Sequence, residues 1–176
     1  ERVDVEAELR LALERDELIV HYQPILDLRA DRIVGFEALA RWQHPGRGLV
    51  LPVDFIALAE ESDLIVALGR TVLEKACRQA QAWRQHWPDE NLVMSVNLSP
   101  RQFVDPNLAA SIAEVLRTTG LDPCALELEI TENVALEDEN AILPLQQLYE
   151  RGVRLALDDF GTGYSSLNCL TRFPLS

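Results

Sequence analysis

The chain has 176 residues, of which 48% are hydrophobic and 26% are charged, and its formal net charge is −13. This length and composition predict one globular domain with one sizeable core. The acidic balance argues against non-specific binding of DNA or RNA, which needs basic residues that neutralise phosphates. It leaves open a small phosphorylated ligand, provided that metal ions or local arginines offset the carboxylates.

Targeting and cysteine signals favour a cytoplasmic domain. The longest uncharged apolar runs, such as residues 64–69, are far too short to span a bilayer, and the N-terminus lacks a secretory pattern. The chain has three cysteines, Cys77, Cys124 and Cys169, without C-x-x-C spacing. This odd number favours reduced thiols over a disulfide framework or a zinc site. Membrane anchoring of a longer protein through an upstream region stays open.

The first 17 residues are expected to form a connector helix, and residues 18–176 the domain itself. Apolar residues recur at helical spacing, at Val5, Leu9, Ala12 and Leu13. The helix begins abruptly and is acidic on its other face. We interpret it as a link from an upstream domain.

Residues 18 to about 40 predict two strands around a polar turn, with Pro24 suited to an edge. In the second strand Glu37 and Arg41 share one face, roughly 13 Å apart. They could bind a metal ion and a phosphate at two ends of one ligand, or both could be surface charges. A loop is expected at 44–48, followed by helices at 52–61 and 64–87.

The rest of the chain alternates between strands and helices. Strands are expected at 92–98, 125–131 and 153–159, and helices at 106–119, 140–151 and from 165 to 172. This alternation predicts parallel βα units, the repeat of a (β/α) barrel.

Oxygen-bearing side chains fall near the ends of these strands: Glu37, Asn97, Glu129, Asp158 and Asp159. In a (β/α) barrel the carboxyl ends of the strands meet at one face, where active sites lie. Oxygen ligands without a matching His or Cys set suit hard cations such as Mg²⁺ or Mn²⁺. Taken singly, each acidic strand end is equally well a surface charge, and Glu132 is either a supporting residue or a solvent charge. No zinc-protease, Walker or Ser-His-Asp pattern is present.

The motifs resemble one family. Glu37-Ala38-Leu39, Asn97-Leu98-Ser99, Glu129-Ile130-Thr131-Glu132 and the stretch from Asp158 to Ser166 occur in the order found in the EAL-domain family of bacterial cyclic di-GMP phosphodiesterases. The resemblance runs from about Leu18 to the last residue. It implies an α/β fold, a TIM-like barrel with one antiparallel strand, and hydrolysis of cyclic di-GMP to linear pGpG.

The same resemblance implies a role for each motif residue. Glu37, Asn97, Glu129 and Asp158 would ligate metal, and Asp159 would join Asp158 in a two-metal centre, with Glu37, Asp158 and Asp159 catalytic. Gln23 and Arg41 would contact the cyclic dinucleotide, and Glu132 would brace the loop at 160–166. The family also implies a homodimer and an upstream sensory or diguanylate-cyclase-like domain.

The chain departs from the family pattern at its end. A complete barrel needs about 250 residues, and the strand with the family's catalytic lysine, a later glutamate and a glutamine are absent before Ser176. We therefore expect a partial EAL domain whose last barrel units are missing. A non-catalytic cyclic di-GMP receptor or signalling module is the alternative, and another metal-dependent barrel enzyme is a third reading.

Overall fold

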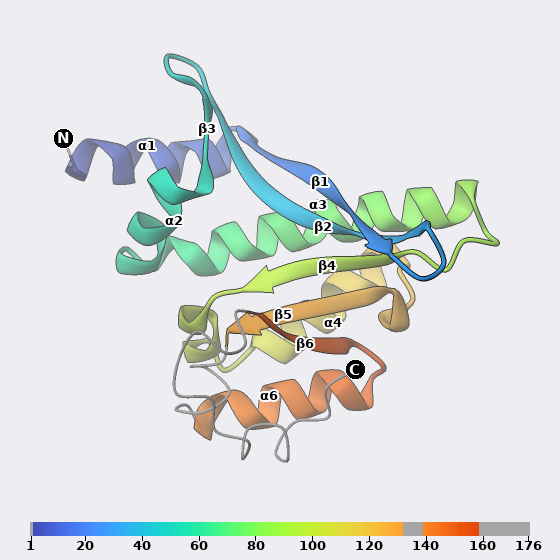
Figure 1. Cartoon of the computed structure of the whole chain (residues 1–176). Helices are drawn as coiled ribbons and strands as arrows, with labels where there is room; N and C mark the ends of the chain where they lie inside the picture. Colours follow the sequence, from blue (N-terminus) through green and yellow to red (C-terminus); the bar gives the residue numbers. More distant parts are fainter. Residues whose placement is uncertain (1, 132–138, 159–176) are drawn as a thin grey trace.

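The computed structural model describes residues 2–131 and 139–158. Figure 1 shows a twisted sheet with helices packed along it. The elements in chain order are α1 (Arg2–Glu14), β1 (Leu18–Asp27), β2 (Arg32–His44), β3 (Gly48–Val50), α2 (Pro52–Glu61), α3 (Leu64–His86), β4 (Val93–Leu98), the 3₁₀ helix η1 (Pro100–Val104), α4 (Leu108–Thr119), the 3₁₀ helix η2 (Pro123–Ala125), β5 (Leu126–Thr131), α6 (Glu139–Glu150) and β6 (Arg154–Asp158).

The sheet has the strand order β1-β2-β4-β5-β6. β2, β4, β5 and β6 pair in parallel, and β1 runs antiparallel to β2 at the edge of the described sheet. This confirms the predicted α/β class and the parallel βα units. Two strands of the described sheet, β1 and the short β3, pair antiparallel with β2. Pro24 lies in the edge strand, where its missing N–H costs no hydrogen bond between central strands.

The loop expected at 44–48 is the turn of a hairpin. β2 ends at His44 and β3 begins at Gly48, and β3, which was not predicted, pairs with the end of β2 so that Val50 lies opposite Trp42. Gly48 has φ +72°, a conformation that favours glycine. A strand of three residues is too short to show a period of two, so the sequence pattern gave no signal for it.

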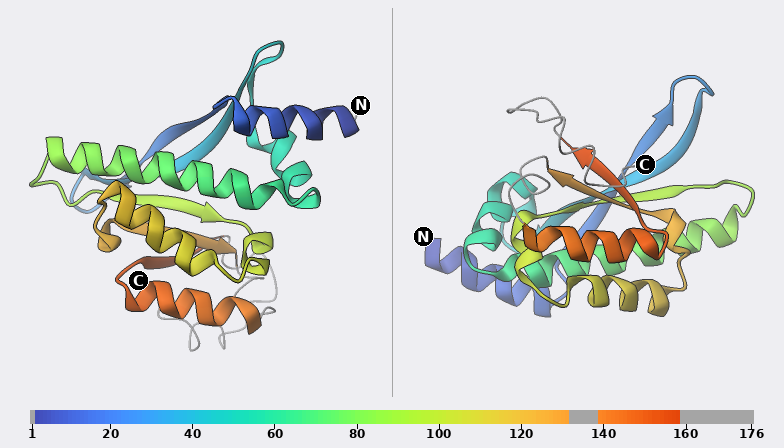
Figure 2. Two further views of the ribbon diagram at one scale, coloured as in Figure 1. Left: turned by 180° about the vertical axis from the view of Figure 1, so that it is seen from behind. Right: turned by 90° about the horizontal axis from the view of Figure 1, so that it is seen from below.

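The described helices lie on one face of the sheet, as Figure 2 shows in its view from below. That face is apolar, and the strand residues that it buries are Ala38, Trp42, Met94, Val96, Leu98, Leu126, Leu128, Ile130 and Leu155. Helix residues such as Phe55, Cys77 and Ile112 pack into the same core. The other face carries the alternate residues of each strand, and these are mostly polar.

The amphipathic helix predicted near the N-terminus is α1. Leu9 and Ala12 are fully buried, and Glu8 pairs with His44 and Arg47 of the β2–β3 hairpin. The helix is therefore packed onto the domain, while its role as a connector stays a prediction. Within the described residues, no helix combines the length and apolar character needed to cross a membrane.

The long helix α3 contributes Cys77 to the core, and Trp83 packs between Tyr22 and Phe36. Trp87 follows the end of the helix and is 50% exposed. The helical period that turns a residue toward the sheet no longer applies beyond His86.

The two described cysteines are expected to differ sharply in reactivity. Burial raises the pKa of the Cys77 thiol to about 12, whereas Cys124 is exposed. The thiolate is the nucleophile, and for Cys77 it forms only as the pH rises toward that raised value. At about pH 8 iodoacetamide should label Cys124 and leave Cys77 unmodified until the protein is unfolded in urea. Peptide mass spectrometry checks this, and equal labelling of both in the folded protein would contradict it.

Candidate functional site

Strand register brings several predicted site residues together on the face opposite the helices. Glu37 of β2 lies beside Ser95 of β4, and Asn97 two residues further on lies beside Glu129 of β5. On the next strand Asp158 lies opposite Thr131, two residues beyond Glu129. Because these strands are parallel, their carboxyl ends meet at one edge of the sheet.

One hydrogen bond in this group joins two motif residues that are 60 positions apart. The side-chain amide of Asn97 donates a hydrogen bond to Oε1 of Glu37 over 2.7 Å. Glu37 is half-buried, so its carboxylate keeps partial access to solvent. Because the amide nitrogen of Asn97 donates this bond, its amide oxygen can act as an acceptor or as a metal ligand.

The two residues predicted to contact substrate lie on the same face. Gln23 of β1 is the register partner of Glu37, and directly opposed side chains in an antiparallel pair lie about 5 Å apart at Cβ. Arg41 is four residues beyond Glu37 on β2, and its Nη1 donates to the Ala40 carbonyl over 2.7 Å. The prediction that Glu37 and Arg41 share one face therefore agrees with the strand geometry.

A cavity of about 290 Å³ opens beside Asn97 and Glu129. Its walls come from the ends of β2, β4 and β5 and from helices α2 and α3, and they include Leu39, Glu60 and Ser99. The cavity is mainly apolar, and its polar groups lie at the ends of β4 and β5, in η1 and in the last turn of α2. This arrangement is common in small-molecule sites, where a few polar groups orient a ligand in an apolar hollow.

A second polar contact lies two residues before Asn97 and Glu129 on the same two strands. Ser95 is fully buried, and its hydroxyl donates to Oε1 of Glu127 over 2.9 Å. The sequence alone gives neither residue a partner. The pairing of β4 with β5, which sets Ser95 beside Glu127, decides it.

The donor chemistry of this edge fits a hard divalent cation. Glu37 and Glu129 supply carboxylates and Asn97 an amide oxygen, which are the ligand types that Mg²⁺ and Mn²⁺ prefer. Across residues 2–131 and 139–158, no three His, Cys, Asp or Glu side chains are gathered as a metal group by themselves. The described set therefore consists of two carboxylates and an amide.

The remaining predicted site residues fall outside the described part of the chain. These are Asp159, Glu132 and the loop at 160–166, together with the helix expected from 165 to 172. Asp158 is placed by its backbone at the end of β6. The predicted roles of all these residues stay predictions.

Comparison with known proteins agrees with the fold and the motifs. The family model of the EAL domain matches residues 6–176. This chain belongs to the EAL domain family. The EAL motif itself is Glu37-Ala38-Leu39 in β2, and its first two residues lie in the part of β2 that pairs with β4.

Relatives within the EAL family include proteins named as cyclic di-GMP phosphodiesterases. Cyclic di-GMP phosphodiesterase PdeR of Escherichia coli K12 is 45% identical over 172 residues, which are 97% of this chain and 26% of PdeR. A solved structure titled as the PaMucR phosphodiesterase in a c-di-GMP complex superposes with a TM-score of 0.90 at 44% identity, and covers 97% of this chain and 69% of that one.

A second solved structure is the FimX EAL domain from Pseudomonas aeruginosa bound to c-di-GMP. It superposes with a TM-score of 0.87 at 26% identity, and covers 98% of this chain and 69% of that one. An uncharacterized signaling protein of Caulobacter vibrioides is 49% identical over 175 residues. The chain spans about a fifth to a quarter of the curated relatives that it matches first.

Proposed function

We propose that this EAL domain hydrolyses cyclic di-GMP to linear pGpG with Mg²⁺ or Mn²⁺ as cofactor. The observation that carries the proposal is the meeting of Glu37, Asn97 and Glu129 at one sheet edge, with Glu37 and Asn97 in direct contact over 2.7 Å. The names of PdeR and PaMucR support the choice of reaction and substrate. Family membership supports Asp158 and Asp159 as the further ligands.

A cation pair held at this edge would activate a water molecule and stabilise the attacking and leaving oxygens of the phosphodiester. Glu37, Asn97 and Glu129 would hold the cations. Bound cations would also offset the negative charge that these carboxylates, in a chain with a net charge of −13, present to an anionic substrate. The acidic composition is therefore compatible with a dinucleotide ligand once the cations are bound.

Arg41 and Gln23 have the chemistry to bind the substrate beside that centre. The guanidinium group of Arg41 matches the geometry of a phosphate and can bind it with two parallel hydrogen bonds. Gln23 lies across from Glu37 and offers both an amide donor and an amide acceptor. With Glu37 and Arg41 about 13 Å apart along β2, the ligand would extend along the strand from the cations to the arginine.

The proposal is tested by incubating the protein with cyclic di-GMP and Mn²⁺ and separating the products by chromatography. We expect pGpG to form, and EDTA to abolish its formation because the cations are removed. Binding of cyclic di-GMP without product, measured by calorimetry, would overturn the proposed reaction and establish the receptor reading. Absence of both binding and product would favour another metal-dependent reaction.

A further inference from the structure

The chain just after Asn97 is tied to a distant helix. The hydroxyl of Ser99 donates a hydrogen bond to Oε1 of Glu60 over 2.7 Å, and Glu60 lies in the last turn of α2. The same hydroxyl accepts the backbone N–H of Arg101 over 3.2 Å. One side chain therefore joins the end of β4, the start of η1 and helix α2.

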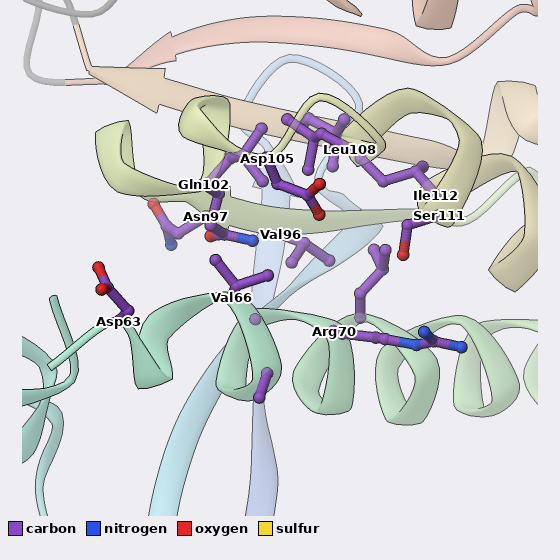
Figure 3. A pocket seen from close by; sticks show the side chains of 15 residues that line it. Asp63, Val66, Arg70, Val96, Asn97, Gln102, Asp105, Leu108, Ser111 and Ile112 are labelled. Atoms are coloured by element: carbon purple, nitrogen blue, oxygen red, sulfur yellow. The ribbon is translucent and has the colours of Figure 1, made fainter.

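The backbone of Ser99 is also held by a buried side chain, that of Gln102. Gln102 is 6% exposed, and its Oε1 accepts the backbone N–H of Ser99 over 3.0 Å. Its amide packs on Gly69 of α3, where an added Cβ would lie 2.3 Å from Nε2 of Gln102. Figure 3 shows the Gln102 amide extending toward α3 in the space between α3 and η1.

These contacts bear on Asn97 because it precedes Ser99 by two residues and lies on the same extended segment. Two residues of strand cover only about 6.6 Å, so a displacement of Ser99 moves the backbone of Asn97 as well. The side-chain amide of Asn97 donates to Glu37 of β2 over 2.7 Å. The orientation of Asn97 thus depends on β2 through its side chain, and on α2 and α3 through its backbone.

We propose that Glu60 is a positioning residue that orients Asn97 through the hydroxyl of Ser99. The consequence for metal binding rests on the proposed function of Asn97 as a ligand. The capping box at the start of η1 needs only Ser99 and Gln102. The Glu60 carboxylate is an additional, charge-assisted acceptor for the Ser99 hydroxyl. Glu60 also lines the cavity that Asn97 and Glu129 line, so the Ser99–Glu60 hydrogen bond lies beside the proposed metal ligands.

The first test needs no metal. In ¹H–¹⁵N spectra of the metal-free protein, the Asn97 side-chain amide, assigned with Asn97→Asp, should report its bond to Glu37. We expect Glu60→Ala to shift and broaden this resonance, because Asn97 then samples several orientations. Glu60→Gln keeps an oxygen acceptor for Ser99 and should retain the parent resonance. An Asn97 amide unchanged in Glu60→Ala would overturn the inference whatever the reaction is.

The second test measures Mn²⁺ affinity by titration calorimetry. Loss of a residue that orients a metal ligand costs 10–100-fold in affinity, and we expect about tenfold weaker binding in Glu60→Ala and in Ser99→Ala. Because both changes remove the same Ser99–Glu60 hydrogen bond, the double variant should bind Mn²⁺ no more weakly than Ser99→Ala. Glu60→Gln should bind like the parent, and unchanged Mn²⁺ affinity in both alanine variants would overturn the inference.

The matched control is Asp54→Ala, which removes a carboxylate from the exposed first turn of the same helix. It should leave both the Asn97 resonance and the Mn²⁺ affinity unchanged. A loss equal to that of Glu60→Ala would assign the effect to α2 as a whole and overturn the specific role of Glu60. A parent protein that binds no Mn²⁺ would instead overturn the proposed function, while the metal-free spectra still decide whether Glu60 orients Asn97.

Discussion

Replacing Glu37 by alanine should reduce cyclic di-GMP hydrolysis by at least about 100-fold. The change removes a proposed metal ligand and also the oxygen that accepts the Asn97 amide over 2.7 Å. Changes in residues that only support a metal ligand already cost 10–100-fold, so the loss of the ligand itself should reach or exceed that range. Formation of pGpG under saturating Mn²⁺ and cyclic di-GMP gives the measurement.

Two variants separate the causes of this loss. Glu37→Gln keeps an acceptor for Asn97 but loses the negative charge, and we expect it to lose turnover almost as fully as Glu37→Ala. Glu114→Ala removes a carboxylate from the exposed surface of α4, where Glu114 pairs with Arg117, and it should retain full turnover. Undiminished turnover in Glu37→Ala, with an unfolding midpoint close to that of the parent, would contradict the proposed role.

Replacing Gly35 by alanine should destabilise the domain by about 3 kcal/mol. Gly35 is buried in β2 opposite Val93 of β4, and an added Cβ would lie 2.4 Å from the Val93 carbonyl oxygen. That oxygen belongs to the backbone of the neighbouring strand, so relief of the clash requires the two strands to separate. We expect a lower urea midpoint with a nearly unchanged m-value.

The clash also lies close to the site, because Glu37 follows Gly35 by two residues on the same strand. Displacement of β2 from β4 should therefore weaken Mn²⁺ binding as well as stability. Gly46→Ala is the matched control, since a Cβ there meets only the His44 ring, at 3.7 Å and beyond. Its free energy of unfolding should lie within about 0.5 kcal/mol of that of the parent. Equal midpoints for the two glycine variants would show that the strands accommodate the extra methyl group.

Strand patterns were predictable where alternation is strong. In β5, Leu126, Leu128 and Ile130 are fully buried and the residues between them are half-buried, as a period of two predicts. Helix α3 ends one residue before its predicted limit, and α6 spans 139–150 where 140–151 was expected. Local periodicity carries this information because burial of one face is repeated every two or 3.6 residues.

The sequence by itself determined the α/β class, the parallel βα units, the EAL-family motifs and the identity of the oxygen-bearing residues at strand ends. Only the tertiary structure decided which of those residues meet. The contact of Glu37 with Asn97 spans 60 positions and that of Glu60 with Ser99 spans 39. Such contacts depend on the order and register of strands and on helix packing, which pattern along the chain does not encode. The same physical reason applies to Gly35, whose need for a small residue comes from a carbonyl on another strand.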